Sequence, residues 1–130
     1  MKEQELNFFS NHNHTEFSNI RNSDCIIKVE DLIDSAYKKG YKGISITDHE
    51  CVSSFVKANR HYYNNYSNTD FKVALGNEIY LVSNVEELKT NGGKHYHFIL
   101  VAKNLEGNKQ IRQLSSKAWS NYFVKNVENL

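Results

Sequence analysis

Several side chains that could bind a metal ion recur at separated points along the chain. Five of the six histidines and two carboxylates fall at or near the ends of predicted strands: His12, His14, His49, His95, His97, Asp48 and Glu78. In an extended segment, His12 and His14 point to the same face, as chelation from a strand requires. Imidazole nitrogens mixed with carboxylates suit zinc, manganese, iron or cobalt better than magnesium or calcium. More than four candidate ligands predicts more than one ion.

Phosphoester hydrolysis is the reaction that such a cluster predicts, because two or three neighbouring ions can activate water and neutralise phosphate oxygens. Each residue alone has a simpler interpretation. A His-x-His pair can be surface polarity, Asp48 could cap the following helix, and Glu78 could be a solvated strand end. Their joint placement favours the metal site. We expect His61, in mid-helix beside Tyr62, to be an ordinary surface or packing residue.

Alternating strands and helices are predicted to position these side chains. We expect strands over 7–11, 43–47, 71–75 with an extension to 82, and 95–102. We expect helices over 29–39, from residue 53 or 54 with Phe55, Val56, Asn59, Tyr62 and Tyr63 on one side, and at the end with Ile111, Leu114, Ser115, Ala118, Trp119 and Tyr122 on one face. This order predicts an α/β protein with a mainly parallel sheet, either doubly wound or part of a barrel, with its chemistry at the carboxyl ends of the strands.

The composition limits the possible functions. The 130 residues, 39% hydrophobic and 24% charged, suit one domain or a piece of one. With 16 basic and 15 acidic residues the net charge is +1, so contact with nucleic acid is expected to be local or supplied by other segments. Without a long apolar run or a signal-like start, we expect a cytoplasmic protein with no membrane role. Cys25 and Cys51 are expected to stay reduced.

Three motifs resemble those of the PHP domain, a polynuclear metal-dependent phosphoesterase module. His12–Ser18 resembles its HxHTxxS motif, Ile46–His49 its TDH motif and Gly76–Glu78 its GxE motif. The stretch His97–Asn104, followed by Gly107 and Leu114–Trp119, is similar to the PHP domain of bacterial or phage-type DNA polymerase III alpha subunits. That stretch separates the polymerase branch from free-standing phosphatases such as histidinol phosphatase.

The resemblance implies a distorted TIM-like (β/α)7 barrel with a metal centre of up to three divalent ions (zinc, manganese or iron), of which residues 1–130 form the N-terminal portion. Carried over by motif, the expected metal ligands are His12, His14, Asp24, His49, Glu78 and His97. Asp24 is the best match if 19–23 includes a short insertion, because the usual position falls on Arg21. His95 competes with His97, and the register favours His97. Asp48 is the expected catalytic aspartate, orienting its neighbour.

The implied function is that of the PHP module of a replicative DNA polymerase, as a metal-dependent 3′–5′ exonuclease or as a stabilising domain. The alternatives are a stand-alone phosphoesterase for a small phosphate monoester, and a non-catalytic metal-binding scaffold. The chain has no Asp-x-Asp pair for nucleotidyl transfer, so polymerase activity is not expected of it.

The family's later ligands, a downstream His or Cys and an Asp-x-His motif, have no counterpart before Leu130. We therefore expect a fragment that exposes a sheet edge and needs a partner. The expected partner is the remainder of the polymerase chain or a complementary fragment, with a DNA 3′ end or a small phosphoester as substrate.

Overall fold

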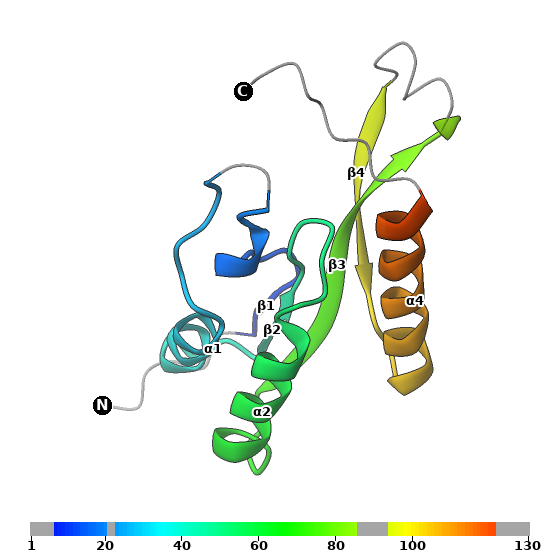
Figure 1. The fold of residues 1–130 in the computed structure, drawn as a ribbon. Coiled ribbons are helices and arrows are strands. Elements are labelled where there is room, and N and C mark those ends of the chain that lie inside the picture. The colour runs from blue at the N-terminus through cyan, green and yellow to red at the C-terminus, as the bar shows by residue number, and fades with distance from the viewer. Residues whose placement is uncertain (1–6, 21–22, 86–93, 122–130) are drawn as a thin grey trace.

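Strands and helices alternate along the chain (Figure 1), and the computed structural model describes residues 7–20, 23–85 and 94–121. The elements are β1 (Phe9–Ser10), the 3-10 helix η1 (Glu16–Ser18), α1 (Val29–Lys38), β2 (Gly43–Ile46), α2 (Phe55–Asn65), β3 (Lys72–Val82), β4 (His95–Val101) and α4 (Leu105–Asn121). The predicted order of strands and helices is confirmed. Arg21, Gly92, Gly93 and Tyr122 lie outside the described residues.

The four strands form one sheet in the order β1-β2-β3-β4. β1, β2 and β3 pair in parallel, and β3 pairs with β4 in antiparallel register from Gly76 opposite Val101 to Val82 opposite His95. The first part of β3, Lys72 to Leu75, pairs with β2, and its continuation from Gly76 pairs with β4. The sheet is therefore parallel near its centre and ends in a long hairpin, which confirms the predicted α/β class.

Gly76 marks the point in β3 where one pairing partner gives way to the other. A Cβ atom at this position would lie 2.4 Å from the carbonyl oxygen of Leu100 and 2.9 Å from Cγ2 of Thr47. Only glycine lets the backbones of β3 and β4 approach this closely. Glu78, two positions after Gly76, therefore lies next to the loop that follows β2 and next to β4.

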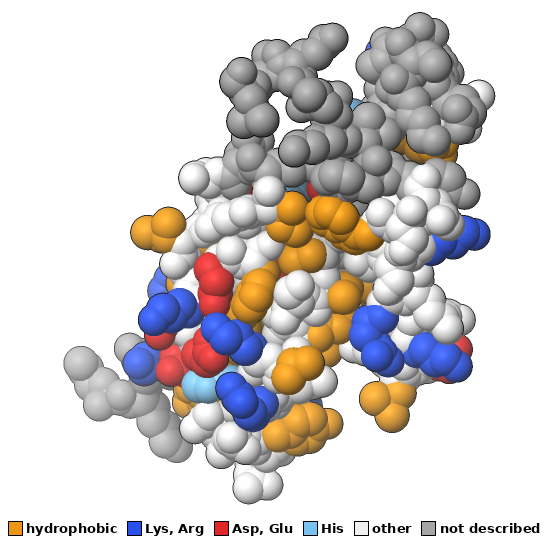
Figure 2. All heavy atoms as spheres, in the orientation of Figure 1, with side chains coloured by type: hydrophobic (Ala, Val, Ile, Leu, Met, Phe, Trp, Pro, Cys, Tyr) orange, Lys and Arg blue, Asp and Glu red, His pale blue; other side chains and the backbone are white. Residues whose placement is uncertain are grey.

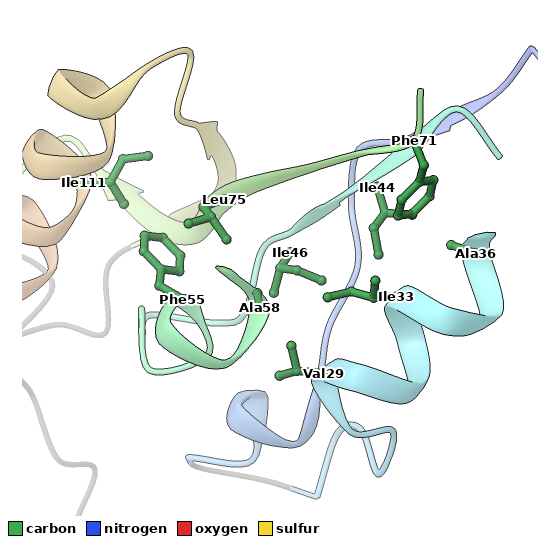
Figure 3. Close-up of a cluster of buried hydrophobic side chains, with 10 residues drawn as sticks. All are labelled: Val29, Ile33, Ala36, Ile44, Ile46, Phe55, Ala58, Phe71, Leu75 and Ile111. Carbon is green, nitrogen blue, oxygen red and sulfur yellow. The ribbon is translucent and has the colours of Figure 1, made fainter. Parts of the chain in front are cut away.

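One hydrophobic core joins helices α1, α2 and α4 to the sheet (Figure 3). It contains Val29, Ile33 and Ala36 of α1, Ile44 and Ile46 of β2, Phe55 and Ala58 of α2, Phe71 and Leu75, and Ile111 of α4. The helices thus cover the face of the sheet that carries these apolar residues. Full burial of each large apolar side chain contributes about 1.5–3 kcal/mol. The helix predicted over 29–39 is confirmed as α1, and its buried residues are Val29, Ile33 and Ala36.

The predicted apolar stripe of α2 is wrong in part. Val56 and Tyr63 are 75% and 67% exposed, while Phe55 and Ala58 are buried. The true inward face passes through Phe55, Ala58 and Tyr62, a helical spacing that the neighbouring aromatic residues obscure in the sequence.

None of the helices in the described part of the chain has the length and apolar character needed to cross a bilayer.

Candidate metal centre

Six side chains that were predicted as metal ligands meet at the carboxyl ends of β1 and β2 and beside β3 and β4. They form three overlapping groups, and within each group one potential ligand atom per residue lies within 4.8 Å of the others. The groups are His12, His14 and Glu78, then His14, Asp24 and His49, and then His49, Glu78 and His97. The structure therefore gathers residues that are up to 85 positions apart in the sequence, from 12 to 97.

Glu78 lies at the middle of this cluster and is only 1% exposed. Its Oε2 lies 2.6 Å from His12 Nε2 and 3.1 Å from His14 Nε2. Its Oε1 contacts His97 Nδ1 and lies 3.7 Å from His49 Nδ1. The two carboxylate oxygens thus face two different pairs of histidines, an arrangement in which one carboxylate could bridge two ions.

The protonation states suit metal binding. Burial would raise the pKa of Glu78, but hydrogen bonds from His12 and His97 outweigh it and hold this pKa below its ordinary value. Burial, reinforced by the neighbouring His49, lowers the pKa of His14. At neutral pH the site therefore offers an ionised carboxylate and a neutral imidazole, which are the forms that bind cations.

Asp24 joins the cluster from the loop that follows η1. Its Oδ2 lies 3.4 Å from His49 Nε2 and 3.9 Å from His14 Nδ1. The side chain of Asn19 shapes this loop, since its Oδ1 accepts hydrogen bonds from the backbone N–H of Asp24 at 2.7 Å and of Cys25 at 2.9 Å. These two hydrogen bonds help to hold Asp24 beside His14 and His49, so Asp24 remains a candidate ligand.

His97 and His95 occupy different surroundings on β4. His97 lies opposite Tyr80 in the β3–β4 register and contacts Glu78. Both rings pack against Tyr80, with centroid separations of 4.9 Å for His95 and 4.8 Å for His97, but His95 belongs to none of the three groups found among the described residues. The geometry therefore favours His97 over His95 as a candidate ligand.

The carboxylate of Asp48 is fully buried and faces the first loop rather than the open part of the cluster. Its Oδ1 accepts hydrogen bonds from Thr15 N at 2.6 Å, Thr15 Oγ1 at 2.9 Å and Ser18 Oγ at 2.8 Å. Because the Ser18 hydroxyl donates to Asp48, it accepts from His14 Nδ1, 3.0 Å away. This places the proton on Nδ1 and leaves the lone pair of His14 Nε2 directed toward Glu78.

Thr15, Ser18 and Asn77 were not assigned roles from the sequence, although all three stand inside the recognised motifs. The side-chain amide of Asn77 donates to the backbone oxygens of Asp48 at 2.8 Å and Cys51 at 2.9 Å, so it fixes the loop that carries His49. Their place beside candidate ligands in the motifs was the sequence feature that could have indicated such roles. Their partners depend on contacts between distant strands, which spacing alone does not reveal.

The donor set fits divalent metal ions. His49 Nδ1 is buried and has no hydrogen-bond partner among the described residues, although it faces Glu78. A buried imidazole nitrogen without a partner is costly unless a cation uses its lone pair. Imidazole nitrogens and carboxylate oxygens together match the preferences of transition-metal ions.

Comparison with known proteins gives a consistent result. Residues 10–129 match the family model of the PHP domain. YorL of Bacillus subtilis, assigned as a DNA polymerase, is 42% identical over 120 residues, covering 86% of this chain and 9% of that protein. The DNA polymerase III subunit alpha of Borreliella burgdorferi is 29% identical over 119 residues, covering 89% and 10%. The chain thus spans about a tenth of the length of these relatives.

A solved structure shares the fold. A protein assigned as a metal-dependent phosphoesterase from Bifidobacterium adolescentis superposes with a TM-score of 0.60 at 20% identity, covering 88% of this chain and 34% of that one. The arrangement of strands and helices is therefore that of a partial TIM-like barrel, as the resemblance to the PHP domain implied.

Proposed function

Since this chain belongs to the PHP domain family, we propose that it binds divalent metal ions and serves phosphoester hydrolysis within a replicative DNA polymerase. The observation that carries the proposal is the buried Glu78, whose two oxygens face separate pairs of histidines. A carboxylate as buried as that of Glu78, at 1% exposure, needs a compensating positive charge, and bound cations would supply it.

The proposed ligands are His12, His14, Asp24, His49, Glu78 and His97. Zinc, manganese and iron all suit this mixture of donors, with up to three ions in a complete site. Bound ions would activate water and neutralise charge on a phosphate group. The chain's own contribution is to hold the imidazoles: Asp48 orients His14 through Ser18, and the backbone oxygen of Asp48 accepts from Glu78 N at 3.1 Å. We thus propose Asp48 as a residue that positions ligands.

The proposed substrate is a DNA 3′ end, hydrolysed in the 3′–5′ direction. This rests on the relatives, which carry the names of DNA polymerases. In Figure 2, acidic and basic side chains are intermixed over α1 and α2. Lys57, for example, forms an ion pair with Glu16 at 3.0 Å. Such a face would not hold a phosphate backbone by charge alone, so we propose that the remainder of a polymerase chain helps to bind DNA in the cytoplasm.

Metal content and hydrolysis of a labelled primer 3′ end, with and without Mn²⁺, test the proposal. We expect bound metal in the wild-type chain, Mn²⁺-dependent hydrolysis when the remaining polymerase chain is present, and loss of both in Glu78→Ala. The pair His97→Ala and His95→Ala is a matched control, since only the first should lower metal content. Metal binding with hydrolysis of a small monoester alone would identify a stand-alone phosphoesterase, and metal binding without hydrolysis a scaffold. A wild-type chain that binds no metal would overturn the proposal.

A further inference from the structure

The residue that follows His49 has an unusual backbone conformation. Glu50 has a φ of 54°, and it is the one non-glycine residue with positive φ among residues 7–20, 23–85 and 94–121. Side chains with a Cβ atom disfavour this left-handed region. Something in the surrounding structure must therefore hold Glu50 in it.

Three hydrogen bonds fix the backbone of Glu50 from two directions. Its N–H donates to the carbonyl oxygen of Glu78 at 2.8 Å, on β3. Its carbonyl oxygen accepts from Trp119 Nε1 at 2.7 Å and from Ser115 Oγ at 3.4 Å. Ser115 and Trp119 lie one turn apart on α4, the helix that runs alongside the β3–β4 hairpin in Figure 1. The peptide after His49 is thus held between β3 and α4.

The three hydrogen bonds to the backbone of Glu50 form a clamp, and this clamp is connected directly to the candidate ligands. His49 and Glu78 form an isolated parallel β-bridge, so their backbones are already neighbours. If Glu50 relaxed to negative φ, either His49 or Cys51 would have to move. Cys51 is buried at 7% exposure, and both its backbone oxygen and its thiol are hydrogen-bonded, to Asn77 and to the Phe17 carbonyl oxygen. His49 is held less firmly, by the bond from its N–H to Ser18 Oγ at 3.2 Å, and its side chain is 21% exposed. Relaxation would therefore displace His49 from Glu78.

We infer that Trp119 is a positioning residue of the metal centre, which holds His49 beside Glu78 through the carbonyl group of Glu50. The inference rests on the proposed function, because it requires that His49 binds a metal ion. It assigns a role to Trp119, which belongs neither to the three groups of candidate ligands nor to the hydrophobic core. Trp119 is 36% exposed, and its indole N–H finds a partner in the carbonyl oxygen of Glu50.

Trp119→Phe tests the inference, because it keeps an aromatic ring and removes the N–H donor. Co²⁺ affinity and the visible absorption of bound Co²⁺ are measured by titration of the full chain. We expect about tenfold weaker binding and a changed spectrum, the lower end of the effect of residues that orient ligands. Leu114→Ala, which shortens an exposed side chain on the same helix, should bind Co²⁺ as the wild type does. Unchanged affinity and spectrum in Trp119→Phe would overturn the inference.

The conformational part of the inference has its own test. Glu50→Gly removes the Cβ that disfavours positive φ, so the loop should depend less on the clamp. In this background we expect Trp119→Phe to weaken Co²⁺ binding by less than about threefold, a non-additive result. An equal loss in both backgrounds would refute the clamp.

A measurement on the wild type covers the case in which the variants do not fold. Trp119 is the single tryptophan of the chain, so one indole N–H signal appears in a ¹⁵N spectrum. If the clamp favours metal binding, metal must by reciprocity favour the clamp, and Co²⁺ or Zn²⁺ should slow solvent exchange of this N–H. Metal binding with unchanged exchange would overturn the inference alone. A wild-type chain that binds no metal would overturn the proposed function and the inference together.

Discussion

Replacing Asp48 with alanine should destabilise the metal-free chain strongly. Asp48 Oδ1 accepts three hydrogen bonds, from Thr15 N, Thr15 Oγ1 and Ser18 Oγ, at 2.6–2.9 Å. Thr15 is 0% exposed and Ser18 is 4% exposed, so water cannot readily replace the carboxylate. Each buried donor left without a partner costs about 1–3 kcal/mol, so we expect the free energy of unfolding to fall by about 3–5 kcal/mol.

Asp48→Asn separates the acceptor from its charge. The amide oxygen can still receive the bonds made to Oδ1, but they are no longer charge-assisted, and such bonds are about half as strong. We expect Asp48→Asn to cost about 1–2 kcal/mol, clearly less than Asp48→Ala. The larger effect of alanine comes from the unpaired groups of Thr15 and Ser18.

Urea unfolding with a chelator present, followed by far-UV circular dichroism, measures both losses without any contribution from bound metal. Thr15→Ala should cost less in the Asp48→Ala background than in the wild type, because the hydroxyl has already lost its carboxylate acceptor and keeps only the bond that it accepts from Phe17 N at 3.3 Å. Equal losses for Asp48→Asn and Asp48→Ala, or a loss below about 1 kcal/mol for Asp48→Ala, would refute the reasoning.

The remaining predictions concern pH, close packing and ligand orientation. Burial and the hydrogen bond to Asp34 raise the pKa of Tyr66 to about 12, while an unfolded tyrosine titrates near 10. The folded state then holds the proton more tightly, so stability should fall by about 1–2 kcal/mol as the pH rises from about 10 to 12, and Tyr66→Phe should remove this part of the loss in urea unfolding. Gly76→Ala should cost about 1–3 kcal/mol because its Cβ would meet a backbone oxygen at 2.4 Å. Gly107→Ala lies in α4, where the nearest neighbours of its Cβ would be Ala102 Cα and Asn104 Oδ1 at 3.6 Å, so it should be neutral or stabilise by about 0.5–1 kcal/mol in the same urea unfolding assay. The opposite order of the two effects would contradict the packing argument. Ser18→Ala should weaken Zn²⁺ binding about 10-fold or more in calorimetry, because His14 loses the bond that fixes its Nε2 lone pair, and unchanged affinity would count against that role.

The sequence was informative about the cluster because His14 and His49 follow short apolar strands and Glu78 follows the parallel part of β3, whereas His97 lies within β4. Side chains at the carboxyl ends of parallel strands meet at one edge, so the order of strands is enough to place His14, His49 and Glu78 together. The buried face of α1 could be predicted equally well, because few residues on the other faces of this helix are apolar. In α2, aromatic residues occur on both sides, and periodicity alone could not exclude Tyr63 from the core.

Other features depend on contacts that no local pattern encodes. The inward turn of the Asp48 carboxylate is set by Thr15 and Ser18, some thirty or more positions earlier (residues 15 and 18 against 48). The left-handed conformation of Glu50 depends on Trp119, which is 69 positions away. Glutamate has no preference for that conformation, so its presence there could be learned only from the folded chain.

The change of pairing partner within β3 has a consequence for ion exchange. One side of Glu78 faces His12 and His14, which follow strand β1 in the parallel part of the sheet. The other side faces His97, on a hairpin whose β4 residues from His95 to Phe98 are exposed. An ion held on the hairpin side would therefore share the bending of a two-stranded ribbon and exchange with solvent sooner than an ion on the parallel side. One carboxylate would then serve a retained ion and a replaceable one.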